Sequence, residues 1–322
     1  MKSAHRTRYG PPEVLTVSDV PVPEPGPGDL LVRVHATTVN RTDCGALWGA
    51  PYVYRFFVGW PRPRVVATGT DFAGEVVATG PGAARFSVGD RVMGFDDNNL
   101  GSHAEYVRVS ERCAVARIPD QVSFDDAAAS MEGAHYARNF IERVPLQAGD
   151  AVLVNGATGA IGSAAVVLLE QMGARVTAVC AEPHRAAVEA LGADRTIDYT
   201  RAPFTDQLKG ETFAFVFDAV GKSTFAACRP LLRDTGAYLS SELGPFGQNP
   251  VYALFAPLMR GPKVRFPIPT NVQRTLDLLV PLLAQGKYEP LIDRRYTLED
   301  IRQAFTYVAS GEKIGNVLLR LT

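Results

Sequence analysis

Apolar runs and helix-forming stretches alternate through the middle of the chain. Ala151–Asn155 is a short apolar run of Val and Leu, long enough for a buried strand. Residues 161–172 are helix-forming and mostly apolar, and Gly173 marks their end. Arg175–Cys180 alternates and is rich in β-branched residues, so it predicts the next strand. A strand, a helix and a strand within about thirty residues predict one βαβ unit.

The same alternation continues to the end of the chain. Further helices are predicted at 123–143, 185–191, 223–232, 271–285 and 298–310. Further strands are predicted at 195–199, 214–218, 237–241 and 316–321. Strands that alternate with helices in this way predict an α/β fold with a doubly wound parallel sheet, covered by helices on both faces.

The first 120 residues follow a different pattern, in which strands succeed one another without intervening helices. Strands are predicted at 29–40, 70–79, 86–95 and 103–109, with Gly89-Asp90 as a hairpin turn. The proline-rich segment 21–28 predicts a rigid, extended entry. Many short strands with turns at close intervals predict a barrel-like β domain.

Composition narrows the class of protein. The chain has 322 residues, 46% hydrophobic and 21% charged, so it is long enough for two globular domains. Its net charge of −1 gives no indication of a nucleic acid or a membrane as partner. No apolar run reaches transmembrane length, and the first ten residues lack the apolar segment of a secretory signal. The four cysteines form no CxxC pair, which is typical of reduced thiols and predicts a cytoplasmic location.

A glycine-rich turn joins the strand Ala151–Asn155 to the helix that follows. A backbone that turns sharply and lets a pyrophosphate approach closely needs glycine. The N–H groups that open the helix point outward, and the helix dipole favours phosphate charge. The turn therefore predicts a dinucleotide site; the alternative is a glycine-rich turn with a structural role only. The predicted contacts are Gly156, Thr158, Gly159, Ala160, Ile161 and Gly162.

The residues at the end of the next strand, Arg175–Cys180, indicate which of the two nicotinamide cofactors binds. An acid at this place binds the ribose diol of NAD, but here the strand ends at Cys180, followed by the small Ala181. Arg185 could pair with the 2′-phosphate of NADP; the alternative is a solvated helix charge. Glu182 argues for NAD, because it could accept a hydrogen bond from a 2′-hydroxyl. On balance these residues favour NADP(H).

Four short motifs resemble the medium-chain dehydrogenase/reductase superfamily, in its zinc-independent quinone oxidoreductase branch. They are VGDRV at 88–92, the glycine turn at 156–162, LGAD at 191–194 with IDY at 197–199, and IGNV at 314–317. The resemblance covers essentially the whole chain. It implies a GroES-like β-barrel catalytic domain at 1–122, a Rossmann dinucleotide-binding domain at 123–268, and a C-terminal segment at 269–322 that returns to the catalytic domain.

The resemblance also predicts that the protein holds no catalytic zinc. Zinc members of the superfamily have a cysteine and a histidine where this chain has Asn40 and Thr70. Zinc prefers thiolate and imidazole ligands, and an amide and a hydroxyl cannot replace them. The four-cysteine lobe of those enzymes is missing too. Cys44 and His103 remain possible ligands, although a lone Cys and a lone His are more often packing residues.

Candidate catalytic residues follow from the same resemblance. Asn40 matches an asparagine that lines the active site of quinone oxidoreductases; the alternative is a buried amide that caps a strand end. His135 and Tyr136 fall where the family has a segment that faces the nicotinamide, and either could donate a proton. His135 departs from a family threonine, and hydrogen bonding within the packed helix is the alternative for both residues.

Further contacts are implied for the cofactor and the substrate. By resemblance, Tyr199 lies near the 2′-phosphate, and the remaining cofactor contacts are Val220, Ser241, Phe266 and Ile268. For the segment 266–268 the alternative is a simple interdomain hinge. An aromatic stretch after Asn40 could form the wall of an apolar pocket for a flat substrate; the alternative is a loop held by its own aromatic residues. The predicted pocket residues are Thr42, Tyr52, Tyr54 and Trp60, with Phe56 and Phe57 beside them.

Together these features predict a zinc-independent, NADPH-dependent reductase of a small molecule, either a quinone or an α,β-unsaturated carbonyl compound. Such acceptors spread negative charge over their own conjugated system and need little help from the protein. The alternatives are a zinc-free carbonyl reductase or alcohol dehydrogenase, and a nucleotide-binding protein without turnover. The resemblance further implies a homodimer that pairs edge strands of the nucleotide domain.

Overall fold

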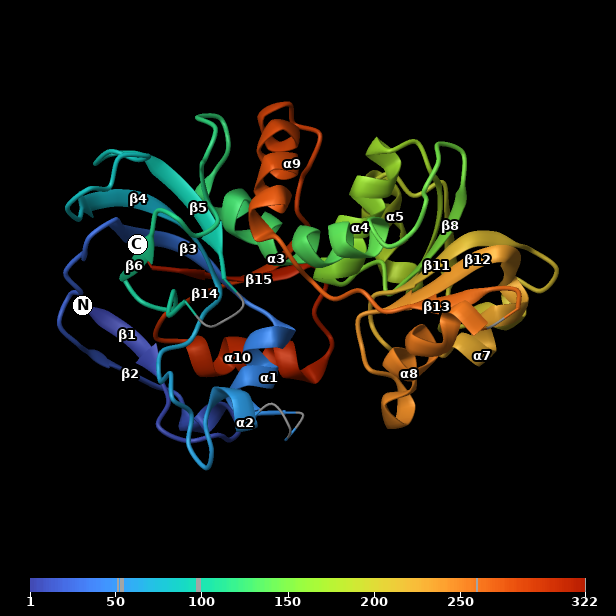
Figure 1. Ribbon diagram of the computed structural model, residues 1–322, viewed down its shortest axis with the longest axis horizontal. Coiled ribbons are helices and arrows are strands. Elements are labelled where there is room, and N and C mark those ends of the chain that lie inside the picture. The colour runs from blue at the N-terminus through green and yellow to red at the C-terminus, as the bar shows by residue number, and fades with distance from the viewer. Residues whose placement is uncertain (51, 53–54, 97–99, 259, 322) are drawn as a thin grey trace. The chain divides into compact units, whose positions relative to one another are not determined.

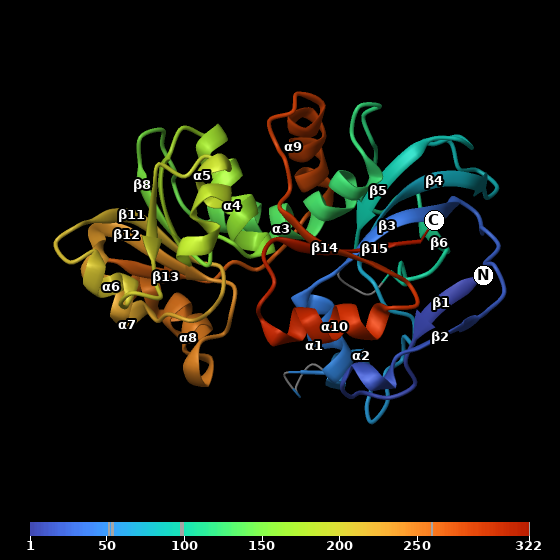
Figure 2. The same cartoon turned by 180° about the vertical axis from the view of Figure 1, so that it is seen from behind.

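The computed structural model describes residues 1–50, 52, 55–96, 100–258 and 260–321, and its chain divides into two units (Figures 1 and 2). Unit 1 comprises Met1–Met131, Val272–Gly286 and Ile292–Thr322. Unit 2 comprises Glu132–Asn271 and Lys287–Leu291. The first division between the units falls inside a long helix, whereas the sequence predicts a boundary just before this helix.

Unit 2 is built on a six-stranded parallel sheet of order β10-β9-β8-β11-β12-β13. The strand order reverses between β8 and β11, and ligands of such sheets bind outside the carboxyl ends of the strands at this point. The strands are β8 (Ala151–Asn155), β9 (Arg175–Cys180), β10 (Arg195–Asp198), β11 (Phe213–Asp218), β12 (Leu232–Ser240) and β13 (Lys263–Arg265). The predicted doubly wound sheet is thus confirmed, while β13 has no counterpart in the predicted pattern.

Helices cover both faces of this sheet. Figure 1 shows α4 and α5 on one face and α7 and α8 on the other. The helix predicted at 223–232 is shorter than expected, because Pro230 follows one helical turn and a 3₁₀ turn replaces the rest. The helices are α4 (Ala160–Gln171), α5 (Arg185–Ala190), α6 (Phe204–Gln207), α7 (Phe225–Cys228) and α8 (Gln248–Phe255). The 3₁₀ turns are η3 (Glu182–His184), η4 (Arg229–Leu231), η5 (Pro245–Gly247) and η6 (Ala256–Leu258).

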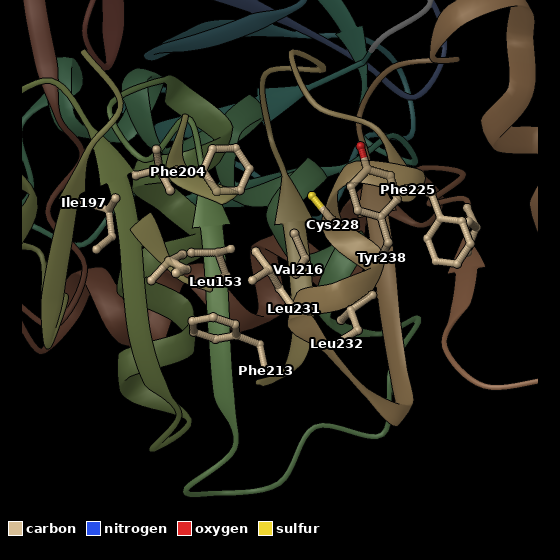
Figure 3. Close-up of a cluster of buried hydrophobic side chains, with 13 residues drawn as sticks. Leu153, Ile197, Phe204, Phe213, Val216, Phe225, Cys228, Leu231, Leu232 and Tyr238 are labelled. Carbon is tan, nitrogen blue, oxygen red and sulfur yellow. The ribbon is translucent and has the colours of Figure 1, made fainter. Parts of the chain in front are cut away.

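One apolar cluster fills the space between the sheet of unit 2 and its helices (Figure 3). Leu153 and Val216 come from the two central strands and are fully buried. Phe204 and Phe225 contribute from the helices α6 and α7. Burying side chains of this size stabilises the fold by about 1.5–3 kcal/mol each, so the strand order is fixed by packing as well as by hydrogen bonds.

Unit 1 contains a seven-stranded sheet and a two-stranded sheet. β3, which has eleven residues, pairs with β15, β4 and β6, and its residues Leu30, Val32 and Val34 alternate into one apolar cluster. The strands of the larger sheet are β3 (Asp29–Val39), β4 (Asp71–Thr79), β5 (Arg91–Phe95), β6 (Tyr106–Ser110), β7 (Val115–Arg117), β14 (Ile292–Thr297) and β15 (Asn316–Arg320). The smaller sheet consists of β1 (Lys2–His5) and β2 (Thr16–Asp19).

The helices of unit 1 come from both parts of the sequence. α10 packs on α1, and Leu47 and Phe305 meet there in a second apolar cluster. α3 begins in unit 1 and continues into unit 2. The helices are α1 (Arg41–Trp48), α2 (Arg55–Val58), α3 (Phe124–Ile141), α9 (Val272–Ala284) and α10 (Ile301–Ser310), with the 3₁₀ turn η1 (Pro12–Val14). None of the described helices is long and apolar enough to cross a bilayer.

Two predictions for unit 1 are wrong. The hairpin at Gly89-Asp90 is absent, because 86–90 is a turn, and β5 pairs with β4 and β7 instead. The stretch after Asn40 is helical at α1 and α2 rather than a continuous loop. Its start carries a capping signal, Asn40 followed three residues later by Asp43, that identifies a helix start.

A buried carboxylate lies where β3 and β4 meet in unit 1. Asp71 is fully buried, and its Oδ1 accepts hydrogen bonds from the Thr38 N–H (2.7 Å) and from Thr37 Oγ1 (3.0 Å). Its Oδ2 accepts from Thr38 Oγ1. Burial raises the pKa of Asp71 to about 6, although these hydrogen bonds act in the opposite direction. The carboxylate thereby fixes the backbone at the end of β3, two residues before Asn40.

This group makes folding stability depend on pH. Because the folded chain keeps the Asp71 proton up to about pH 6, while the unfolded chain loses it near 3.8, stability falls as pH rises between these values. The difference corresponds to about 3 kcal/mol. We expect Asp71→Asn, which cannot ionise, to become more stable relative to the natural chain as pH rises from 4 to 7.5. Denaturant midpoints across this range measure the effect.

Asp120→Asn, at an exposed carboxyl of the same unit, is the matched control. Its difference from the natural chain should be the same at both ends of the pH range. Parallel stability curves for the natural chain and Asp71→Asn would show that Asp71 ionises as readily in the fold as outside it.

Candidate functional site

The turn between β8 and α4 leaves no space for side chains. Gly156 has a φ of +80°, and a Cβ at this position would lie 2.8 Å from Val220 Cβ. A Cβ on Gly162 would lie 2.1 Å from the Gly156 carbonyl oxygen. Both positions therefore require glycine, and Gly162 allows the first turn of α4 to pack directly on the strand end.

The amino end of α4 is open. Gly159 is the N-cap and provides no side-chain hydrogen bond, and the first helical bond runs from the Ser163 N–H to the Gly159 carbonyl. The N–H groups of Ala160, Ile161 and Gly162 thus begin the helix without an acceptor inside it. Thr158 is partly exposed beside them. Such a helix start is suited to a phosphate group.

Asp218 holds the neighbouring strand ends together, and the sequence analysis did not identify this role. Its carboxylate is fully buried and accepts from Asn155 Nδ2 (2.9 Å), Tyr238 Oη (2.9 Å), the Gly221 N–H (3.0 Å) and the Ser223 N–H (3.1 Å). These bonds fix the loop that carries Val220 against the glycine turn. An acid at the end of an otherwise apolar strand is the signal that could have identified it.

The end of β9 carries no negative charge of its own. Cys180 is buried, and burial raises the pKa of its thiol to about 11, so the side chain is neutral. Arg185 Nη2 donates to Glu182 Oε2 over 2.6 Å. Arg185 Nε is buried and has no hydrogen-bond partner in the described part of the chain. Arg201 Nη2 also donates to Glu182 Oε2, over 3.3 Å, and the sequence analysis missed this second arginine.

These features fit a nicotinamide dinucleotide. The glycine turn would hold the pyrophosphate, and the orphaned Arg185 Nε offers a donor to a further anionic group. The other predicted contacts, Tyr199 and Val220, are 56% and 37% exposed, so both can reach a ligand. Ala181 and Ser241 follow β9 and β12 at the same carboxyl edge, and Phe266 and Ile268 follow β13, with Ile268 exposed.

The predicted proton donors lie on the part of α3 that belongs to unit 2. His135 is buried, and burial together with the nearby Arg138 lowers its pKa to about 4. The ring is therefore neutral at pH 7, and any proton that it gives comes from the neutral imidazole. Tyr136 is partly exposed and meets the His135 ring edge to face, with centroids 5.7 Å apart. The catalytic role of either residue stays a prediction.

Asn40, in unit 1, caps a helix. Its Oδ1 accepts from the Asp43 N–H (2.9 Å), and Asp43 Oδ2 accepts from the Asn40 N–H (3.0 Å), which forms a capping box at the start of α1. Asn40 Nδ2 donates to Thr70 Oγ1 over 3.3 Å, and its second hydrogen has no partner among the described residues. The capping alternative is thus realised at a helix rather than a strand end, and one amide hydrogen remains available.

The side chains near Asn40 do not suit zinc. Both nitrogens of the buried His103 are already engaged, by Thr68 Oγ1 (2.9 Å) and the Thr38 carbonyl (2.8 Å). Cys44 is buried and faces the Phe305 carbonyl. In the ranges that the structure describes, no three His, Cys, Asp or Glu side chains gather where they could hold a metal ion. The amide of Asn40 and the hydroxyl of Thr70 are poor zinc ligands, so these residues do not fit a catalytic zinc ion.

The predicted substrate-pocket residues occupy separate places in unit 1. Thr42 lies in the first turn of α1 and is partly exposed. Tyr52 is exposed. The guanidinium carbon of Arg55 lies over the Tyr52 ring, 4.7 Å from the ring centroid. Trp60 is exposed and stacks on Phe56, with centroids 5.6 Å apart. Tyr54 lies outside the described residues, and a pocket formed by these side chains stays a prediction.

Two family models match the chain. The alcohol dehydrogenase GroES-like domain matches residues 26–120, and the zinc-binding dehydrogenase model matches residues 191–319. The second description names a metal for which the described residues offer no ligand set.

Two relatives match this chain over most of their own length. The 2-methylene-furan-3-one reductase of Solanum lycopersicum is 28% identical over 333 residues, which cover 99% of this chain and 79% of that protein. The quinone oxidoreductase of Pseudomonas aeruginosa is 28% identical over 328 residues, which cover 97% of each chain.

A solved structure supports the fold independently. The quinone oxidoreductase from Coxiella burnetii superposes with a TM-score of 0.88 at 24% identity, over 100% of this chain and 99% of that chain. The GroES-like match, the Rossmann strand order and these relatives agree. This chain is therefore an oxidoreductase that belongs to the medium-chain dehydrogenase/reductase superfamily, in its quinone oxidoreductase-like family.

Proposed function

We propose that this protein is a zinc-independent, NADPH-dependent reductase of quinones or α,β-unsaturated carbonyl compounds. The family binds a nicotinamide cofactor, and the β8–α4 turn of this chain has the shape for its pyrophosphate. The observation that carries the substrate class is the pair Asn40 and Thr70, an amide and a hydroxyl that hydrogen-bond to each other where zinc members have ligands. The names of the tomato and Pseudomonas relatives are consistent with such acceptors.

The preference for NADPH rests on the end of β9. The neutral Cys180 does not repel a phosphate, and Arg185 presents a guanidinium with a buried, unpartnered Nε. Glu182 opposes this preference, because its carboxylate could accept from the 2′-hydroxyl of NADH. The cofactor preference therefore depends on whether Arg185 pairs with the 2′-phosphate of NADPH or stays paired with the Glu182 carboxylate.

The reaction needs little from the protein beyond placement. A bound nicotinamide would supply the hydride. The free Asn40 amide hydrogen can donate to a substrate oxygen as negative charge develops on it, which stabilises the transition state more than the substrate. An isolated ketone lacks conjugation, and a metal would contribute several kcal/mol to its polarisation. Conjugated acceptors are therefore the better match.

Proton delivery distinguishes the two candidates on α3. Since the pKa of His135 is lowered to about 4, this ring cannot act as an imidazolium at neutral pH. Tyr136 is the more accessible of the two and carries a hydroxyl that can donate. We therefore assign the proton to Tyr136 and give His135 a packing role beside it.

A homodimer accompanies this proposal. β13 is an edge strand of the sheet of unit 2, and among the described strands only β12 pairs with it. Exposed apolar side chains of α8 and η6, among them Leu254 and Leu258, belong to the same unit. Pairing of two such edges would cover these groups in a second copy of the chain.

The substrate assignment is tested with a panel of acceptors. We expect NADPH oxidation to be at least tenfold faster, in kcat/KM, with quinones or enones than with saturated ketones of similar size. Stopped-flow or steady-state absorbance at saturating NADPH measures it. Ketones or secondary alcohols as the better substrates would establish the carbonyl reductase alternative. Tight NADPH binding without turnover on any acceptor would establish the nucleotide-binding alternative.

Two substitutions separate the roles of Asn40. Asn40→Ser keeps an oxygen that caps α1 but removes the amide donor, whereas Asn40→Ala removes both. We expect both variants to lower kcat by roughly tenfold or more, with unchanged NADPH affinity, because the donor acts as charge develops. Only Asn40→Ala should also lose about 1 kcal/mol of stability. Full turnover in Asn40→Ala, which leaves no donor at this position, would restrict Asn40 to its capping role.

Arg185→Ala tests the cofactor assignment. A charge-assisted hydrogen bond to phosphate is lost, so NADPH should bind roughly ten- to a hundredfold more weakly. The affinity for NADH, which lacks the phosphate, should stay nearly unchanged and serves as the internal control. Dissociation constants from the fluorescence of the reduced cofactors report both values. Equal losses for the two cofactors would mean that Arg185 supports the fold of the site rather than the phosphate.

A further inference from the structure

Two guanidinium groups converge on a single carboxylate oxygen at the carboxyl edge of the sheet of unit 2. Glu182 Oε2 accepts from Arg185 Nη2 over 2.6 Å and from Arg201 Nη2 over 3.3 Å. The side chains of Glu182, Arg185 and Arg201 are 44%, 42% and 67% exposed. Ion pairs this exposed contribute little to stability, so a stronger anion can displace the carboxylate at small cost.

The strand register brings these residues together. In the β9–β10 pair, Cys180 lies opposite Asp198, so the segments that follow the two strands leave the sheet side by side. Asp198 Oδ1 accepts from the N–H and the hydroxyl of Thr200, which turns the chain. Asp198 Oδ2 pairs with Arg201 Nε over 3.2 Å. Arg201 is thereby anchored at Nε, while its Nη2 donates to Glu182.

Donors outnumber acceptors at this place. Arg185 Nε is buried without a partner, and Arg201 Nη1 has none within the described residues. Glu182 offers one oxygen to both arginines, and Cys180 is neutral beside them. A phosphate group has three oxygens and up to two negative charges. It could therefore accept hydrogen bonds from both guanidinium groups, whereas Glu182 offers them a single oxygen.

We propose that Arg201 is a second ligand of the cofactor's 2′-phosphate, and that Glu182 is the residue that limits discrimination, because it occupies the shared position until the phosphate displaces it. This inference rests on the proposed preference for NADPH. The glutamate then acts twice against that preference. It neutralises the two guanidiniums while no phosphate is present, and it can accept a hydrogen bond from the 2′-hydroxyl of NADH.

The test uses two fragments that differ only in the phosphate, 2′,5′-ADP and 5′-AMP, with calorimetric titration of the full chain. Arg201→Ala should weaken 2′,5′-ADP roughly tenfold and leave 5′-AMP unchanged. Arg201→Lys should recover part of that loss, because it restores the charge without the fork. Glu182→Gln should tighten 2′,5′-ADP roughly threefold or more and should weaken NADH.

The double variant tests the competition directly. If Glu182 competes for Arg201, removing Arg201 should cost more 2′,5′-ADP affinity in the Glu182→Gln background than in the natural chain. Arg195→Ala is the matched control, since Arg195 begins β10 and pairs with Glu211 at 2.9 Å. This variant removes the same charge at the start of the strand that precedes Arg201, and it should change the binding of neither fragment.

The outcomes separate this inference from the proposed function. If the natural chain binds 2′,5′-ADP no more tightly than 5′-AMP, the NADPH preference itself is wrong. If that preference exists and Arg201→Ala leaves it intact, Arg201 is only a surface ion-pair partner and this inference alone is overturned. Equal weakening of both fragments in Arg201→Ala would indicate a structural role, which likewise contradicts it.

Discussion

The close approach between the β8 strand end and the first turn of α4 is the constraint on which unit 2 depends. A methyl group on Gly162 would meet the Gly156 carbonyl at 2.1 Å, so the backbone atoms themselves are in contact. A second contact of this kind occurs where a Cβ on Gly133, in α3, would lie 2.5 Å from the Ala160 carbonyl. α4 is thus held at its amino end from two sides, and its open N–H groups are fixed at the carboxyl edge of the sheet.

Two buried carboxylates support the surroundings of the candidate sites in different ways. Asp218 is surrounded by donors from Asn155, Tyr238 and the following loop, and it joins three segments of unit 2. Asp71 receives hydrogen bonds from Thr37 and Thr38, and burial raises its pKa to about 6. The first arrangement joins strand ends and a loop by hydrogen bonds, whereas in the second, burial makes the charge costly near neutral pH.

Burial also removes charge from most groups that could do chemistry. His103 and His135 are neutral because their pKa values are lowered to about 4, and the Cys180 thiol is neutral because its pKa is raised to about 11. The charged side chains at the end of β9 are the exposed ones of Glu182, Arg185 and Arg201. The anion binding proposed for this place would therefore depend on surface electrostatics and be sensitive to single substitutions.

The sequence by itself determined the central βαβ unit, the doubly wound sheet and the glycine turn. Those features depend on local periodicity and on glycine at fixed spacing, which are readable without neighbours. It also indicated that Asn40 and Thr70 are no zinc ligands, because ligand chemistry belongs to the residue type.

Only the tertiary structure decided which residues meet. The pairing of β9 with β10 brings Arg201 to Glu182, nineteen positions away, and no local pattern encodes this register. The three-residue strand β13 forms because the nine-residue β12 beside it supplies partners, so its own sequence carries little signal. The available hydrogen of Asn40 and the neutral ring of His135 follow from capping and burial, which depend on the complete packing around them.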